Sequence, residues 1–174
     1  MKPINRRQFV IRLSLTAAAA VILPKLGFSK SGYLEDTNVA DEYIEAQTVY
    51  GKIKGQRIDG ANIFKGVPYA GRVSGDRRFR RPAPLESWTD TRDALQLGAR
   101  AMQTSGPNGP QPAEDCLFLN VWTPANDNKK RPVMVYSHGG GYVSGSGGSG
   151  GQDGANLARN FDVVVVETNH RLGL

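Results

Sequence analysis

A glycine-rich loop late in the chain is the part of the sequence best suited to chemistry. Nine of the 21 glycines fall between Gly139 and Gly154, and the loop opens with the run His138-Gly-Gly-Gly-Tyr142. Backbone N–H groups that converge on a negatively charged oxygen need residues without Cβ, both to reach unusual φ values and to let a substrate carbonyl approach. On its composition alone, the loop predicts either an oxyanion-binding site or a flexible surface linker.

Two shorter patterns inside this loop point to different chemistry. Residues 147–151 fit the nucleophile elbow G-x-S-x-G, but such an elbow follows a hydrophobic strand directly, and the residues before it are small and polar, which argues against Ser149 as a nucleophile. Residues 145–150 fit the dinucleotide fingerprint G-x-G-x-x-G, and Glu167 stands near the position of its ribose-binding carboxylate. The first glycine of that fingerprint also follows its strand directly. A nucleotide-binding protein therefore stays open as the weaker alternative.

The elements around the loop indicate an α/β fold. The runs at 132–137 and 162–167 are apolar at nearly every position, which is typical of buried strands. A short helix with one apolar face is expected between them at 153–161, with Asp153 as its N-cap. Strand, glycine loop, helix and strand in this order form a βαβ unit of a parallel sheet. The run at 115–121 predicts one more buried strand.

The residues before these strands predict a smaller antiparallel unit. After a polar segment at 30–45, residues 48–55 and 61–67 are expected to be two short strands joined by a turn at Asp59-Gly60, which makes a hairpin. Residues 71–90 hold prolines, glycines and an arginine cluster, so we expect an irregular surface crossing there. The expected fold class is therefore α/β, with a small antiparallel hairpin that leads into a mostly parallel sheet.

The positive charge of the chain lies in its N-terminus. The formal net charge is +6, but residues 1–29 hold five Lys and Arg and no acidic residue, so the remainder carries +1. We therefore expect no nucleic-acid partner. The single cysteine, Cys116, excludes an internal disulfide and a cysteine-built zinc site, and we expect no metal or other cofactor.

Residues 1–29 resemble a twin-arginine export signal. Arg6 and Arg7 precede Gln-Phe and a small, apolar run from Leu13 to Leu23. This run suits the core of a secretory signal and is too short to span a bilayer, which needs about 20 residues. We expect export to the periplasm or the extracellular space without a stable membrane anchor; an ordinary export signal with a fortuitous arginine pair is the alternative. Residues 30–174 then form the exported part.

Four segments between residue 47 and the last residue resemble the type B carboxylesterases, the α/β-hydrolases that include the cholinesterases. In the family's order they are Gly66-Val-Pro-Tyr-Ala70 with the following Arg78-Phe79, then Glu114-Asp-Cys-Leu-Phe-Leu-Asn-Val121, His138-Gly-Gly-Gly-Tyr142, and Asn169-His-Arg-Leu-Gly173. Their combined spacing is far more specific than any one motif. The resemblance implies the N-terminal part of an α/β-hydrolase domain.

The resemblance implies a serine esterase that acts on small-molecule carboxylic esters. Gly140 and Gly141 would supply two oxyanion N–H groups, His138 would help to shape the loop, and Tyr142 would line a substrate pocket. In the family the serine nucleophile, its acid and its base lie further along, so we interpret the chain as an N-terminal fragment that by itself does not turn over esters. A catalytically dead relative that serves as a binding module is the other alternative.

Further residues receive structural roles from the resemblance. Arg78 and Glu114 match a pair that relatives join by a salt bridge, which would cost about 3 to 5 kcal/mol to break from one side if it were fully buried. His170 replaces the tyrosine of the family pattern and is expected to pack or hydrogen-bond. Cys116 stands where relatives often form a disulfide, but the partner is missing, so we expect a buried free thiol.

If the chain is a fragment, we expect it to be poorly soluble when it is expressed alone. An apolar strand at a sheet edge would leave residues 163–166 half covered, and such edges pair with other chains. We expect residues 30–174, expressed alone, to aggregate or to require a partner. Size-exclusion chromatography and thermal melting test this, and a soluble monomer that melts cooperatively would contradict it.

Overall fold

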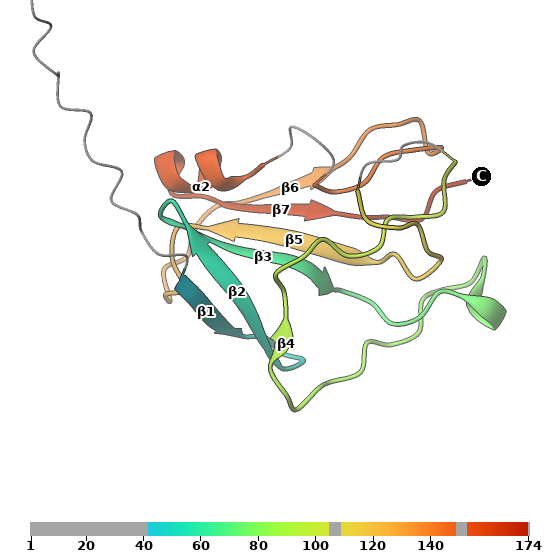
Figure 1. Ribbon diagram of the computed structural model, residues 1–174, viewed down its shortest axis with the longest axis horizontal. Helices are drawn as coiled ribbons and strands as arrows, with labels where there is room; N and C mark the ends of the chain where they lie inside the picture. The colour runs from blue at the N-terminus through green and yellow to red at the C-terminus, as the bar shows by residue number, and fades with distance from the viewer. Residues whose placement is uncertain (1–41, 105–108, 149–152, 174) are drawn as a thin grey trace, which may run out of the picture. The chain divides into compact units, whose positions relative to one another are not determined.

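The hairpin expected from the sequence is present in the computed structural model, which describes residues 42–104, 109–148 and 153–173 (Figure 1). Strands β2 (Lys52–Ile58) and β3 (Ala61–Pro68) pair antiparallel and are joined by Asp59 and Gly60. Both turn residues have positive φ, 48° and 80°, as a two-residue hairpin turn requires. Strand β1 (Glu42–Gln47) pairs antiparallel with β2, where the sequence predicted mostly a polar segment.

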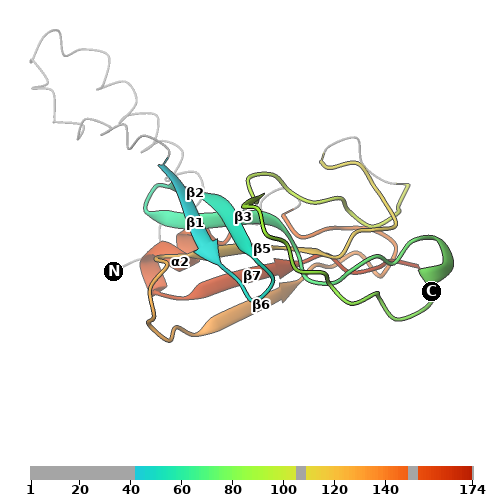
Figure 2. The ribbon, with the colours of Figure 1, turned by 90° about the horizontal axis from the view of Figure 1, so that it is seen from below.

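The described strands form one sheet in the order β1-β2-β3-β5-β7-β6, with β4 beside β2. The remaining elements are the 3-10 helix η1 (Gly75–Arg77), β4 (Arg92–Asp93), β5 (Phe118–Thr123), β6 (Val133–Ser137), α2 (Ala155–Phe161) and β7 (Val164–Thr168). Figures 1 and 2 show β1 and β2 running at a steep angle to β5, β6 and β7, which is the twist that sheets acquire. The segment predicted as an export signal lies outside the described residues, and so does Ser149.

The expectation of a mostly parallel sheet is wrong. Strand β5 pairs antiparallel with β3 on one side and with β7 on the other. Parallel pairing joins β6 to β7, and two residues of β4 to β2. An extended parallel pair needs a crossover, usually a helix. Within the described residues, the stretch between β6 and β7 is the one that contains an α-helix, so the predicted βαβ unit is confined to one edge of the sheet.

Helix α2 packs closely against the sheet. Its Ala158 is fully buried in a cluster with Trp122 of β5 and Val165 of β7. At the N-terminus of the helix, a Cβ on Gly154 would lie 2.7 Å from the Cβ of Val165, so only glycine permits this approach. The helix therefore fixes the crossover that carries the glycine loop.

The residues that flank β6 and α2 are joined by charge. The Arg131 guanidinium, just before β6, bonds through Nε to Asp162 Oδ1 at 2.7 Å and through Nη2 to Asp127 Oδ2 at 2.9 Å. Asp162 ends α2 in the left-handed conformation and also pairs with Lys129. The guanidinium lowers the pKa of Asp127 to about 2. These contacts hold the start of β6 against the end of the crossover helix.

The exposed apolar strand is β6 and not the stretch at 163–166. Strand β7 lies between β5 and β6, so residues 163–166 are not at the sheet edge, although three of these four valines are half-buried and only Val165 is buried. On β6, by contrast, Val133, Met134, Val135 and Tyr136 are between 42% and 68% exposed. Because successive side chains of a strand point to opposite faces of the sheet, both faces of β6 are open to solvent. Among the described residues, the uncovered sheet edge is one strand further out than the sequence predicted.

Candidate active site

The glycine loop begins directly after β6. Because β6 and β7 are parallel, their C-terminal ends lie at the same end of the sheet, where the loop emerges (Figure 1). Open α/β sheets bind their ligands at this end. The position is therefore the one at which a ligand site is expected.

Three consecutive residues of the loop have positive φ: 124° at Gly140, 60° at Gly141 and 60° at Tyr142. A Cβ on Gly140 would lie 2.0 Å from the carbonyl oxygen of Ser144, so only glycine fits at that position. The Gly140 carbonyl in turn accepts hydrogen bonds from the N–H groups of Val143, at 3.1 Å, and Ser144, at 3.2 Å. The loop is thus a tight turn and differs from a flexible linker in having its own hydrogen bonds.

The amides of Gly140 and Gly141 are open to a ligand. Both residues are exposed, and neither N–H donates to an acceptor within the described part of the chain. A Cβ on Gly139 or on Gly141 would meet nothing within 4 Å, so there is open space beside the loop backbone. Unpaired N–H groups beside open space meet the first requirement of an oxyanion site. Their role as oxyanion donors stays a prediction.

His138 lies at the base of the loop and is 7% exposed. Its Nδ1 lies 2.9 Å from the carbonyl oxygen of Gly139, and its Nε2 is buried with no partner in the described residues. The His170 ring stacks on the His138 ring, with 4.3 Å between centroids and 8° between planes. Tyr142 is 63% exposed, and its ring lies 6.0 Å from that of His170. The structure therefore brings three of the residues singled out in the sequence into one cluster.

Gln103 clamps the far end of the loop, a role that sequence reasoning missed. Its side-chain amide forms two hydrogen bonds with the backbone of Gly145, one to the carbonyl oxygen at 2.9 Å and one from the N–H at 3.0 Å. A Cβ on Gly145 would lie 2.4 Å from the Gly139 carbonyl oxygen, so the two limbs of the loop touch. A lone glutamine in an irregular segment gives no sequence signal for such a contact.

Asn169 is the second residue that sequence reasoning left without a role. It is 5% exposed, and its Oδ1 accepts a hydrogen bond from the N–H of Gly147 at 2.7 Å. Its Nδ2 donates to the Ala99 carbonyl at 2.9 Å, and its own N–H donates to the Phe118 carbonyl at 2.8 Å. Tyr69 donates from its hydroxyl to the Asn169 carbonyl at 2.5 Å. One buried side chain and its backbone thus join the loop, β5 and the segments around Ala99 and Tyr69.

Glu167 does not suit the role that a nucleotide-binding site would give it. The residue is 4% exposed, and its carboxylate accepts a hydrogen bond from the backbone of Gly148. Burial raises its pKa. A carboxylate that holds a ribose must be reachable by the ligand, so this burial weighs against the nucleotide alternative.

Arg78 and Glu114 form an ion pair, with 2.8 Å between Nε and Oε1. The side chains are 60% and 33% exposed, so the large cost of breaking a buried pair does not apply, and a value up to about 1 kcal/mol is appropriate. Cys116 is a free thiol that is 1% exposed, and burial raises its pKa. The thiol is therefore poorly suited to act as a nucleophile.

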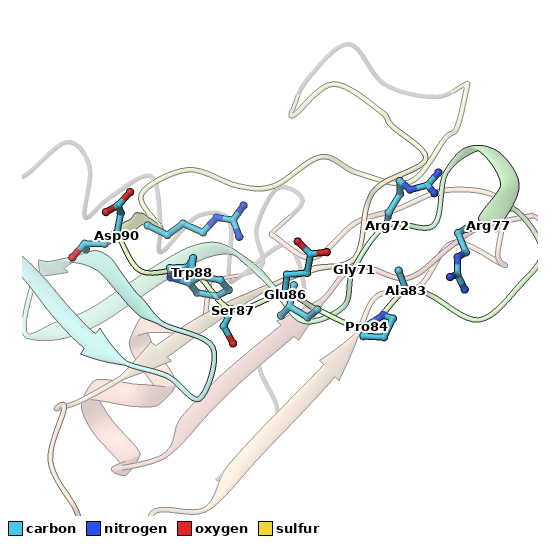
Figure 3. Close-up of a pocket in the computed structure, with 12 residues that line it drawn as sticks. Gly71, Arg72, Arg77, Ala83, Pro84, Glu86, Ser87, Trp88 and Asp90 are labelled. Atoms are coloured by element: carbon cyan, nitrogen blue, oxygen red, sulfur yellow. The ribbon is translucent and has the colours of Figure 1, made fainter.

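Two surface pockets lie in the irregular crossing and beside it. One, of about 830 Å³, is lined by Arg78, Glu114 and Cys116 and by His170 and Gly173, next to the glycine loop. The other, of about 730 Å³, has Arg72 and Arg77 at one end and Trp88 and Asp90 at the other (Figure 3). Neither pocket is lined by a described residue of the glycine loop, but the first is lined by His170, which stacks on His138 at the base of that loop. We assign the second pocket no part in the site.

The described residues offer no metal site and no membrane span. Within them, no group of three or more His, Cys, Asp or Glu could hold a metal ion. No helix found there is long and apolar enough to cross a bilayer.

Comparison with known proteins decides the family, because the model of the "Carboxylesterase family" matches residues 42–174. The chain belongs to this family. It is 41% identical over 132 residues to the para-nitrobenzyl esterase of Bacillus subtilis, and this match covers 72% of this chain and 27% of the relative. It is 42% identical over 137 residues to the phenmedipham hydrolase of Pseudarthrobacter oxydans, with coverage of 74% and 28%.

Solved carboxylesterases share the fold of this family member. The crystal structure of the Geobacillus stearothermophilus carboxylesterase EST55 matches with a TM-score of 0.69 at 43% identity, over 74% of this chain and 27% of that one. The chain thus spans about a quarter of the length of the carboxylesterases it matches. The N-terminal part of an α/β-hydrolase fold, expected from the sequence motifs, is confirmed.

The hydrogen bonds of Asn169 predict its contribution to stability. Asn169→Ala leaves the Gly147 N–H and the Ala99 carbonyl without their partner, and a buried polar group that loses its partner costs about 1 to 3 kcal/mol. We expect the free energy of unfolding, measured by urea titration at low protein concentration, to fall by that amount. Asn160→Ala, on the exposed side of α2, should change it by less than about 0.5 kcal/mol. Equal effects of both substitutions would contradict this role of Asn169.

Proposed function

We propose that the protein to which this chain belongs hydrolyses small-molecule carboxylic esters. The observation that carries the proposal is the pair of exposed amides at Gly140 and Gly141, which have no acceptor among the described residues. They lie at the end of the sheet where open α/β sheets bind ligands, in a chain whose structure matches carboxylesterases. Among described residues, open space lies beside Gly141. An ester carbonyl that enters this space would meet two N–H groups already held in place.

In the proposed reaction these residues stabilise charge. Attack on an ester carbonyl places negative charge on its oxygen, and each N–H donor aimed at that oxygen lowers the barrier by about 2.7 to 4 kcal/mol. Tyr142, whose ring is exposed beside the glycines, would contact the acyl or alcohol group. The nucleophile, the acid and the base would come from polypeptide outside residues 1–174. We therefore expect the chain of 174 residues alone to be inactive.

A chimera with a complete esterase tests the proposal. Residues 42–174 replace the matching region of the Bacillus subtilis para-nitrobenzyl esterase, and turnover of p-nitrophenyl acetate is measured together with thermal melting. Turnover well above buffer supports the proposal. A chimera that melts cooperatively but does not turn over the ester contradicts it and favours the binding module. If this chimera does not fold, a smaller exchange of residues 132–173 gives the same readout.

Substitutions in this chimera test the oxyanion role of the glycines. Gly141→Ala places a methyl group in the open space beside the amides and an alanine at a φ of 60°, where it is strained, so kcat should fall by about 10² or more. Gly139→Ala is the control for an added methyl group alone, because a Cβ there also meets nothing within 4 Å and Gly139 does not have a positive φ; it should retain most of the activity. Equal losses in both variants would refute the assignment.

We also propose that the protein is exported through its twin-arginine segment. The joint replacement Arg6→Lys and Arg7→Lys should retain the full chain in the cytoplasm of a bacterial host, because the receptor reads the arginine pair. Arg12→Lys, with the same change of residue type, should leave export intact. Fractionation followed by immunoblotting measures both. Export that persists in the double variant would indicate an ordinary export signal.

A further inference from the structure

We infer that His170 is a positioning residue, which holds the glycine loop in its active conformation through aromatic contacts. The two rings that it contacts, His138 and Tyr142, lie immediately before and immediately after the three glycines. One ring thus touches both ends of the segment that carries the proposed oxyanion donors. The inference rests on the proposed function of that loop.

The backbone at His170 is fixed by the sheet. Residues 169–173, which we call the strap, continue from the end of β7. Its first residue, Asn169, forms four hydrogen bonds. It donates to the carbonyls of Phe118 and Ala99, and it accepts from the N–H of Gly147 and the hydroxyl of Tyr69. The His170 ring therefore projects from a rigid attachment. A side chain can hold a loop in one conformation only when its own backbone is held in place.

The far end of the strap holds the loop a second time. The N–H of Gly173 donates to the Tyr142 carbonyl at 2.7 Å. This bond fixes the peptide unit between Tyr142 and Val143, one residue beyond the last glycine, while the His170 ring lies against the rings on either side of the glycines. Strap and loop are thus joined by this backbone hydrogen bond and by the two ring contacts of His170, in addition to the hydrogen bond from Gly147 to the Asn169 side chain.

The His138 ring depends on the stack for its orientation. Its Nδ1 contacts the carbonyl of the neighbouring Gly139, and its Nε2 has no partner within the described residues. Neither nitrogen is therefore bonded to another element in this part of the chain. The parallel His170 ring, at 4.3 Å, is the aromatic contact that sets the plane of His138. The Nδ1 atom in turn lies where a Cβ on Gly145 would be 2.5 Å away, so a tilt of the ring would disturb the loop's other limb.

The glycines make such an outside restraint necessary. Residues without Cβ lose the most conformational freedom on ordering, so three in a row do not hold one conformation by themselves. Oxyanion donors act only when they are preorganised, and a misplacement of about 1 Å can cost about 10²-fold in rate. The His170 ring supplies this restraint from outside the loop, without touching the reacting atoms.

Variants of His170 in the esterase chimera test the inference. His170→Ala should lower kcat tenfold to a hundredfold with little change in KM, because the donors act mainly in the transition state. His170→Phe, which keeps a flat ring, should restore kcat to within a few-fold. His170→Leu keeps apolar volume without the ring and should behave like alanine. Phe161→Ala, which removes an exposed ring from α2, should leave kcat unchanged.

The outcomes separate this inference from the proposed function. An unsubstituted chimera that folds but is inactive contradicts the proposed function. An active chimera in which His170→Ala or His170→Leu matches the unsubstituted kcat overturns the positioning role. Rescue by leucine as complete as rescue by phenylalanine would also overturn it, because simple space filling would then suffice. Should the alanine variant fail to melt cooperatively, the comparison of leucine with phenylalanine decides.

Discussion

The hydrogen bonds of one buried asparagine hold the candidate site together. Asn169 stands where β7 ends, and its side chain binds Gly147 of the glycine loop on one side and the backbone of Ala99 on the other. An amide side chain suits this position, because it both accepts from an N–H and donates to a carbonyl. A leucine of similar volume would leave both backbone groups unpaired. The loop and the strap therefore share an attachment at Asn169, next to the hydrogen bond that Glu167 of β7 accepts from Gly148.

The loop combines local strain with support from distant residues. Positive φ at three successive residues, one of them Tyr142, is a conformation that the turn's own two hydrogen bonds would not maintain. Gln103 holds its far limb, and the strap holds its near limb. Backbone donors held in this way need no reorganisation when charge develops on a bound group. The chemistry we propose therefore depends on a glycine segment whose backbone is held in one conformation by the residues around it.

Much of the local structure could be predicted from the sequence. The Asp59-Gly60 turn, the strand that became β6, the helix and the strand that became β7 follow from turn residues and apolar runs. These signals are short-range. The antiparallel placement of β5 between β3 and β7 could not be predicted, because an apolar run carries no direction. Strand β1 was missed because its residues are largely polar and exposed.

The sequence predicted which residues form the loop of the candidate site, but it did not predict which distant residues hold that loop in place. The glycines and His138 stand out by composition and spacing, but Gln103 lies 42 residues before its partner Gly145. Asn169 likewise reaches back 70 residues to Ala99. Polar residues in irregular segments form many different contacts, and one sequence does not say which. The support of a glycine loop is therefore visible only in three dimensions.

The solitary thiol gives the molecule a built-in reporter. Cys116 is 1% exposed and is enclosed by Val73, Ala101 and Leu117, beside the pocket that His170 also lines. A reagent such as a maleimide can reach the sulfur only when this cluster opens. Because the chain has a single cysteine, alkylation can occur at this site alone. Its rate therefore measures how often the region between the arginine-rich crossing and the strap opens.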